Sequence, residues 1–148
     1  MYNPVYVSNN FLIRSFREYK PITAMKLQKM LYFLYRDYLQ ETCKYLFTER
    51  FSTWKYGPVL ESVYDTFKDF KTNNITKYGG IPAYSINEKK DISLKKLIDD
   101  IWDKCRTHNG IYLSKLTHKE GGAWLCAWAN NQPFLLDDDI MKDNILIE

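Results

Sequence analysis

The stretch TAMKLQKMLYFLYRDYLQETC, residues 23–43, predicts a long buried α-helix at the centre of the fold. Its apolar residues recur at intervals of three and four, which places them on one helix face: Leu27, Met30, Leu31, Leu34 and Tyr38. Aromatic residues at positions 32, 33 and 35 widen this face, so neighbouring elements should contact the helix from several sides. The hydroxyl of Thr23 can cap the first turn.

Helical patterns also lie on both sides of this stretch. The helix before it should run from about Asn9 to Tyr19, with Ser8 or Asn9 as its cap, and should end before Pro21. A helix after it should begin at Pro58 and end near residue 70, because proline lacks the N–H that has no acceptor at a first helical position.

The second half of the chain predicts further, shorter helices. They are expected over residues 94–105, 111–116, about 121–129 and from about 137 onward. Asp91 or Ser93 should cap the first, and Gly110 should close it. Residues 117–120, THKE, have the form of a capping box for the helix that carries the tryptophans. Residues 137–139 are aspartates, which favour a helix N-terminus.

Two regions depart from the helical period. Residues 46–47 and 51–56 could form short extended pieces, and residues 83–86 alternate in a way that predicts one short strand. There is no internal repeat, low-complexity tract or linker. The predicted fold class is therefore mostly α, a compact single-domain helical bundle with at most a short minor β element, spanning residues 1–148.

Composition limits the possible partners. A chain of 148 residues, 45% of them hydrophobic, can bury roughly two-thirds of its unfolded surface in a core. The net charge of +3 is modest, and its densest basic runs are Lys89-Lys90 and Lys95-Lys96, so direct nucleic-acid binding is not expected. Aromatic residues make up 16% of the chain, which fits either an aromatic core or a face that binds a partner.

Cysteine usage and the N-terminus indicate the compartment. The three cysteines are widely spaced and form no CxxC motif, which is typical of reduced thiols. Residues 1–16 contain no long apolar run, so neither a signal peptide nor a membrane span is expected. We expect a cytoplasmic protein in a bacterial host cell, without a membrane partner.

The common catalytic signatures are absent, so no enzyme activity and no cofactor are expected. The best metal candidate combines Cys105, His108, His118 and Cys126. Because Cys105 lies on an apolar helical stripe, a core position is the simpler interpretation, and no metal is expected. His118 and Glu120 precede two glycines, where a helix N-terminus could hold an anion, but a capped helix start explains them equally.

Three blocks of sequence carry a resemblance to a known family. They read KLQKMLYF at residues 26–33, FSTWKYGPV at 51–59 with Val63-Tyr64 behind it, and LSKLTHKEGGAW at 113–124. Together they resemble the Panacea domain of SocA-like antitoxins and their phage-associated relatives, from about Ser8 to Ile145. Met30 stands where leucine is more usual, a volume-conserving difference. The resemblance implies a mainly α fold and an antitoxin that binds and neutralises a cognate toxin.

Some motif residues have a simple packing role, and others do not. Leu27, Leu31, Tyr64 and Trp124 are expected in the core, whereas Lys26, Gln28 and Lys29 lie off the buried stripe. Trp54 and Tyr56 lie in a loop, where they either tuck back or contact a partner. The candidate partner-binding residues are Lys26, Lys29, Trp54, Tyr56, His118 and Glu120.

Three functions are compatible with these observations. The first is a protein-binding antitoxin. The second is a phage or mobile-element inhibitor of a host defence nuclease, such as a CRISPR nuclease. The third is an enzyme or nucleotide-binding protein whose site combines His118, Glu120, Lys26 and Tyr56. The sequence leaves the identity of the partner and the oligomeric state open.

Overall fold

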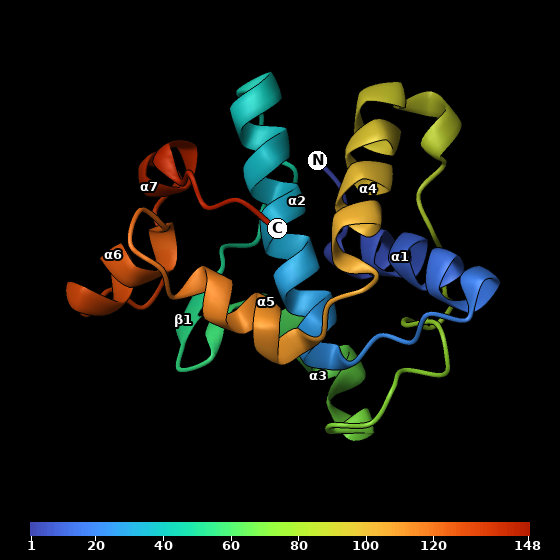
Figure 1. Ribbon diagram of the computed structural model, residues 1–148. Coiled ribbons are helices and arrows are strands. Elements are labelled where there is room, and N and C mark those ends of the chain that lie inside the picture. Colours follow the sequence, from blue (N-terminus) through green and yellow to red (C-terminus); the bar gives the residue numbers. More distant parts are fainter.

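The helix α2 (Ala24–Thr42) forms the axis of the computed structural model, which describes residues 1–148 (Figure 1). The other helices are α1 (Pro4–Glu18), α3 (Glu61–Phe67), α4 (Ile92–Cys105), α5 (Gly110–Thr117), α6 (Ala123–Ala129) and α7 (Asp137–Lys142). Two short 3-10 helices, η1 (Lys68–Phe70) and η2 (Glu88–Lys90), and one hairpin of β1 (Ser52–Trp54) and β2 (Gly57–Val59) complete the chain. The expected mostly α fold with a minor β element is confirmed.

The predicted central position of α2 is also confirmed. It packs against α1, α3, α4, α5, α7 and β2. In Figure 1, α1 and α4 lie on one side of it, α6 and α7 lie on the other, and α5 crosses near its N-terminal end. A single hydrophobic cluster of 35 buried residues draws members from every α-helix, so the chain has one core. No helix is long and apolar enough to cross a bilayer.

The first helix starts earlier than predicted. It begins at Pro4, and the side chain of Asn3 caps it by accepting the Val5 N–H at 2.8 Å. Proline fits this first position because no helical acceptor exists for the missing N–H. The predicted start near Ser8 and Asn9 is wrong, and both of these residues are buried inside the helix.

The predicted strand over residues 83–86 is also wrong, because the segment has no partner strand. The hydrogen bonds that a partner strand would make come instead from buried asparagines of α1. Asn10 accepts the Ile86 N–H at 2.8 Å and donates to the Ile86 carbonyl at 3.0 Å. Asn9 donates to the carbonyls of Gly79 and Tyr84. The segment therefore has its backbone groups bonded to side chains of α1 rather than to another strand.

Pro58 does not begin a helix, which corrects a third prediction. It lies in β2 opposite Thr53, and α3 begins at Glu61 with Leu60 as its cap residue. The preceding Gly57 has a φ of +117°, a backbone conformation that favours glycine and turns the chain back on itself. The GP pair therefore closes a hairpin rather than starting a helix.

In the second half of the chain, Gly110 and the THKE segment do not have the roles that the sequence predicts for them. Asp91 caps α4 as expected, but Gly110 is the first residue of α5, and the Asn109 side chain caps it by accepting the Tyr112 N–H. The THKE capping box does not form, because the Thr117 hydroxyl donates back to the Ser114 carbonyl. The next helix, α6, begins instead at residue 123.

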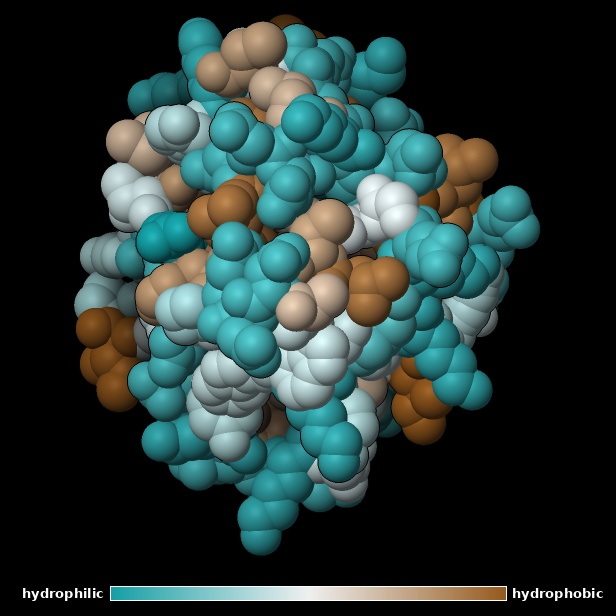
Figure 2. Space-filling view, turned by 90° about the vertical axis from the view of Figure 1, so that its left-hand side faces the viewer, coloured by the Kyte–Doolittle hydropathy of each residue, from teal (hydrophilic) through white to brown (hydrophobic).

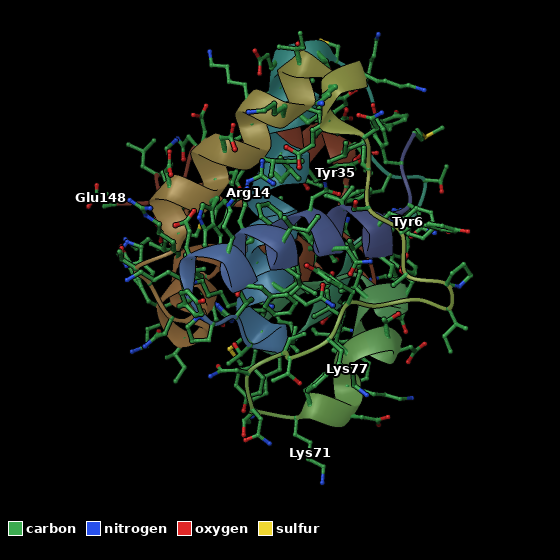
Figure 3. All side chains as sticks on the ribbon, turned by 90° about the vertical axis from the view of Figure 1, so that its right-hand side faces the viewer. Tyr6, Arg14, Tyr35, Lys71, Lys77 and Glu148 are labelled. Atoms are coloured by element: carbon green, nitrogen blue, oxygen red, sulfur yellow. The ribbon has the colours of Figure 1, made fainter.

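Arg14 ties α1 to the segments that follow α3. Its guanidinium lies 2.6 Å from Glu88 and 2.7 Å from Asp99, and these carboxylates hold the pKa of the arginine above its ordinary value despite burial. Figure 3 shows Arg14 between α1 and α4. A buried arginine of this kind is stable only with its partners in place.

Candidate partner-binding groove

An open groove of about 770 Å³ lies between the N-terminal turn of α2, the hairpin, α3 and the start of α5. Its volume falls in the range of ligand-binding pockets, roughly 300–1,000 Å³. Its walls are mainly apolar and aromatic, and include Leu27, Val59, Val63, Phe67, Trp54, Tyr56 and Tyr64. By contrast, on the face that carries α6 and α7, hydrophobic residues form small separate patches between hydrophilic ones (Figure 2).

Side chains of α2 form hydrogen bonds with the backbone of β2 and of the residue that follows it. The Gln28 amide donates to the Leu60 carbonyl at 3.0 Å and accepts the Leu60 N–H at 2.9 Å. The Lys29 ammonium donates to the Pro58 carbonyl at 3.1 Å. These bonds explain why polar residues at positions 28 and 29 lie off the apolar stripe and are nevertheless buried.

Side chains from α5, from its C-cap residue His118 and from α6 bond the backbone at the turn of the hairpin. The Ser114 hydroxyl donates to the Tyr56 carbonyl at 2.5 Å. The two ring nitrogens of His118 lie 2.6 Å from the Ser114 carbonyl and 2.9 Å from the Lys55 carbonyl. The Trp124 indole donates to the Trp54 carbonyl at 2.7 Å, and its ring packs 3.9 Å from the imidazole. We call Gln28, Lys29, Ser114, His118 and Trp124 the hairpin clamp.

Lys29 is the most unusual member of the hairpin clamp. Its side chain is 2% exposed, and burial lowers its pKa from 10.5 to about 7. Removing an ammonium from water is costly unless a carboxylate compensates it, and here a backbone carbonyl is the acceptor. A lysine in this setting binds its proton more weakly in the folded chain than in the unfolded chain.

We expect this difference to make folding stability depend on pH. Between about pH 7 and pH 10 the unfolded chain holds the Lys29 proton and the folded chain releases it, so the free energy of unfolding rises with pH. Below this window the cost of burying the charge is fully present. Relative to Lys29→Met, the wild type should gain about 2 kcal/mol between about pH 7 and pH 9, measured by urea unfolding. If the free energy of unfolding depended on pH in the same way for both proteins, the lowered pKa of Lys29 would be contradicted.

Aromatic side chains at the turn of the clamped hairpin and on the neighbouring α3 are partly or largely exposed. Trp54 is half-buried and packs edge-to-face on Tyr64, with ring centroids 4.8 Å apart. Tyr56 is 58% exposed, and the Lys55 ammonium lies 5.5 Å from its ring. Tyr64 is 42% exposed, so its predicted place in the core is wrong. Trp54 and Tyr56 thus form an aromatic rim beside the groove. The backbone that carries them is bonded by side chains of α2 on one side and of α5 and α6 on the other.

The six predicted partner-binding residues occupy four different settings. Lys29, Trp54 and Tyr56 line the groove, although Lys29 is buried in its wall. His118 lies behind the hairpin as part of the clamp. Lys26 is buried near α4, where its ammonium donates to the Arg106 carbonyl and burial lowers its pKa. Glu120 is exposed in the segment between α5 and α6.

Other residues of the site were not predicted. Gln28 and Ser114 stand inside the quoted motif blocks, but a sequence does not show which backbone they bond. Ile111 lines the groove from the first turn of α5 and is 62% exposed. Its position directly after Asn109-Gly110 is the one sequence signal that could have indicated it. Cys105, His108, His118 and Cys126 do not come together as a possible metal site.

The family model described as "Antitoxin SocA-like, Panacea domain" matches residues 27–125. The chain belongs to this family. The match is shorter than the expected resemblance from about Ser8 to Ile145, yet the whole hairpin clamp of this Panacea domain lies inside it. No curated protein and no solved structure matches the chain.

Proposed function

We propose that this Panacea domain is an antitoxin that neutralises a protein toxin by direct binding, and that it acts by binding rather than by catalysis. Membership of the SocA-like antitoxin family over residues 27–125 is the observation that carries the proposal. The aromatic rim beside the groove is the surface that we assign to the toxin.

The construction of the hairpin supports this assignment. Four side chains bond its backbone and Gln28 bonds the residue directly after it, so the rim residues Trp54 and Tyr56 are presented in a fixed arrangement. A pre-organised surface loses less conformational entropy on association than a flexible one. Large aromatic side chains are also the residues that most often dominate binding energy at interfaces.

The ionisable groups near the groove support binding over catalysis. Both ring nitrogens of His118 lie within hydrogen-bond distance of backbone carbonyls, and Lys29 donates to a third carbonyl. A general base needs a free atom within reach of a substrate proton. In this arrangement these groups are engaged in holding the hairpin.

Rescue of growth tests the proposed function. The reading frame next to the gene is expressed alone and then together with this chain. We expect growth arrest in the first case and growth in the second, with the two proteins purifying as one complex. Continued arrest although both proteins are soluble and abundant would contradict the proposal. Inhibition of a defence nuclease, the other function considered, would block cleavage by that nuclease and leave the toxicity unchanged.

A further inference from the structure

The charge of the groove is one-sided. The lysines that line it are Lys29, Lys55 and Lys71, and no aspartate or glutamate lines it. Lys55 and Lys71 are exposed at its rim, and Figure 3 shows Lys71 extending from the end of the molecule beyond α3. An apolar groove with an exclusively positive rim favours an occupant that is apolar and negatively charged.

Two helix starts add to this positive charge. Thr23–Met25 of the α2 start and Asn109–Ile111 of the α5 start both line the groove. The starts touch, because a Cβ added to Gly110 would lie 2.9 Å from the backbone nitrogen of Lys26. Neither first turn contains an acidic residue. The partial positive charge of a helix N-terminus is therefore not compensated within either first turn.

We propose that the groove binds a segment of the partner protein that combines apolar side chains with aspartate or glutamate. The apolar side chains lie against α3 and the hairpin. The carboxylates face Lys55, Lys71 and the two helix starts. The identity of the partner as a toxin rests on the proposed function, whereas the chemistry of the bound segment follows from the groove itself.

The groove walls favour a peptide over a nucleic acid. Nucleic-acid interfaces are polar and neutralise many phosphates with lysine and arginine. Here the walls are apolar over most of their extent, and only Lys55 and Lys71 are exposed cations. Such a surface gains most from burying aliphatic and aromatic side chains.

Selection from a library of random peptides displayed on phage, with the full chain as bait, tests this proposal without the toxin. Selected peptides should combine aliphatic or aromatic residues with aspartate or glutamate. Their Kd, measured by calorimetry, should weaken at least about tenfold in Lys55→Glu/Lys71→Glu. The control Lys89→Glu/Lys96→Glu makes the same charge change at exposed positions of η2 and α4, and should leave Kd within about twofold.

A second variant guards against misfolding as the cause of lost binding. Ile111 is exposed in the first turn of α5, where a glutamate interacts favourably with the helix dipole. We expect Ile111→Glu to unfold at the same temperature as the wild type or higher, and to bind the selected acidic peptides at least about tenfold more weakly.

Basic or uncharged selected peptides would overturn the proposal, as would full affinity in Lys55→Glu/Lys71→Glu or displacement of the peptide by a single-stranded oligonucleotide. Neutralisation experiments with the toxin distinguish a failure of this proposal from a failure of the proposed function. If acidic peptides bind but no toxin is neutralised, the groove chemistry stands and the antitoxin function fails. If the groove variants lose the peptides yet still neutralise the toxin, the antitoxin function stands and the toxin binds elsewhere, which contradicts the inference.

Discussion

Replacing Asp143 with alanine is expected to lower the free energy of unfolding by about 3–5 kcal/mol. The carboxylate is buried, and it lies 2.5 Å from the Tyr32 hydroxyl and 3.0 Å from the Arg36 guanidinium. It also accepts the backbone N–H groups of Ala123 and Ile145. One side chain thus joins α2, the start of α6 and the C-terminal segment.

The physical reason is the charge that the substitution leaves behind. Arg36 is buried, and its pKa is above the ordinary value only because Asp37 and Asp143 offset the burial. Without Asp143, the buried Arg36 guanidinium keeps Asp37 as its only carboxylate partner, and two backbone N–H groups lose their acceptor.

Denaturant unfolding measures the loss. The matched control is Asp138→Ala, which removes an exposed aspartate from the first turn of α7 and should change stability by less than about 1 kcal/mol. Equal stability of the two variants would show that the Asp143 network contributes nothing beyond a surface charge.

Gly57→Ala is expected to cost about 2–4 kcal/mol through the hairpin clamp. A Cβ at this position would lie 2.7 Å from the Thr117 Oγ1 and 2.9 Å from the Lys29 Cε, and the backbone φ of +117° is strained for any L-residue. Both neighbours are buried, so the added methyl group has to displace the clamp or the hairpin.

Gly80→Ala separates the steric clash from the backbone strain. Gly80 also has a positive φ, +94°, but a Cβ there would meet its nearest neighbour at 3.1 Å. We expect it to cost about 1–2 kcal/mol, less than Gly57→Ala, in the same unfolding experiment. A larger loss at Gly80 would mean that contact with Lys29 and Thr117 is not what restricts position 57.

Local periodicity was enough to predict the helices but not where several of them begin. The spacing in residues 23–43 identifies α2 because burial on several sides follows directly from its apolar pattern. The start of α6 was misassigned, because the acceptor for the Ala123 N–H is Asp143, twenty residues further along the chain. Pro58 was misplaced because proline suits both a helix start and an edge position of a hairpin.

The site was only partly predictable for a related reason. The motif blocks identified Lys29, Trp54, Tyr56 and His118, but not that the cationic and imidazole groups face backbone carbonyls. Hydrogen bonds to backbone leave little pattern in a sequence, because any residue supplies the carbonyl. The groove itself lies between elements that are far apart in the chain, including two helix starts that touch.

The affinity of the purified chain for the proposed toxin, compared between wild type and Tyr56→Ala, tests the central claim most directly. Tyr56 is 58% exposed on the groove rim, so its loss should not unfold the protein. Tyr45 is 54% exposed beyond the other end of α2 and provides the matched control, Tyr45→Ala. The account predicts a Kd at least about tenfold weaker for Tyr56→Ala and unchanged for Tyr45→Ala. Equal affinity of all three proteins, or no binding by the wild type, would contradict it.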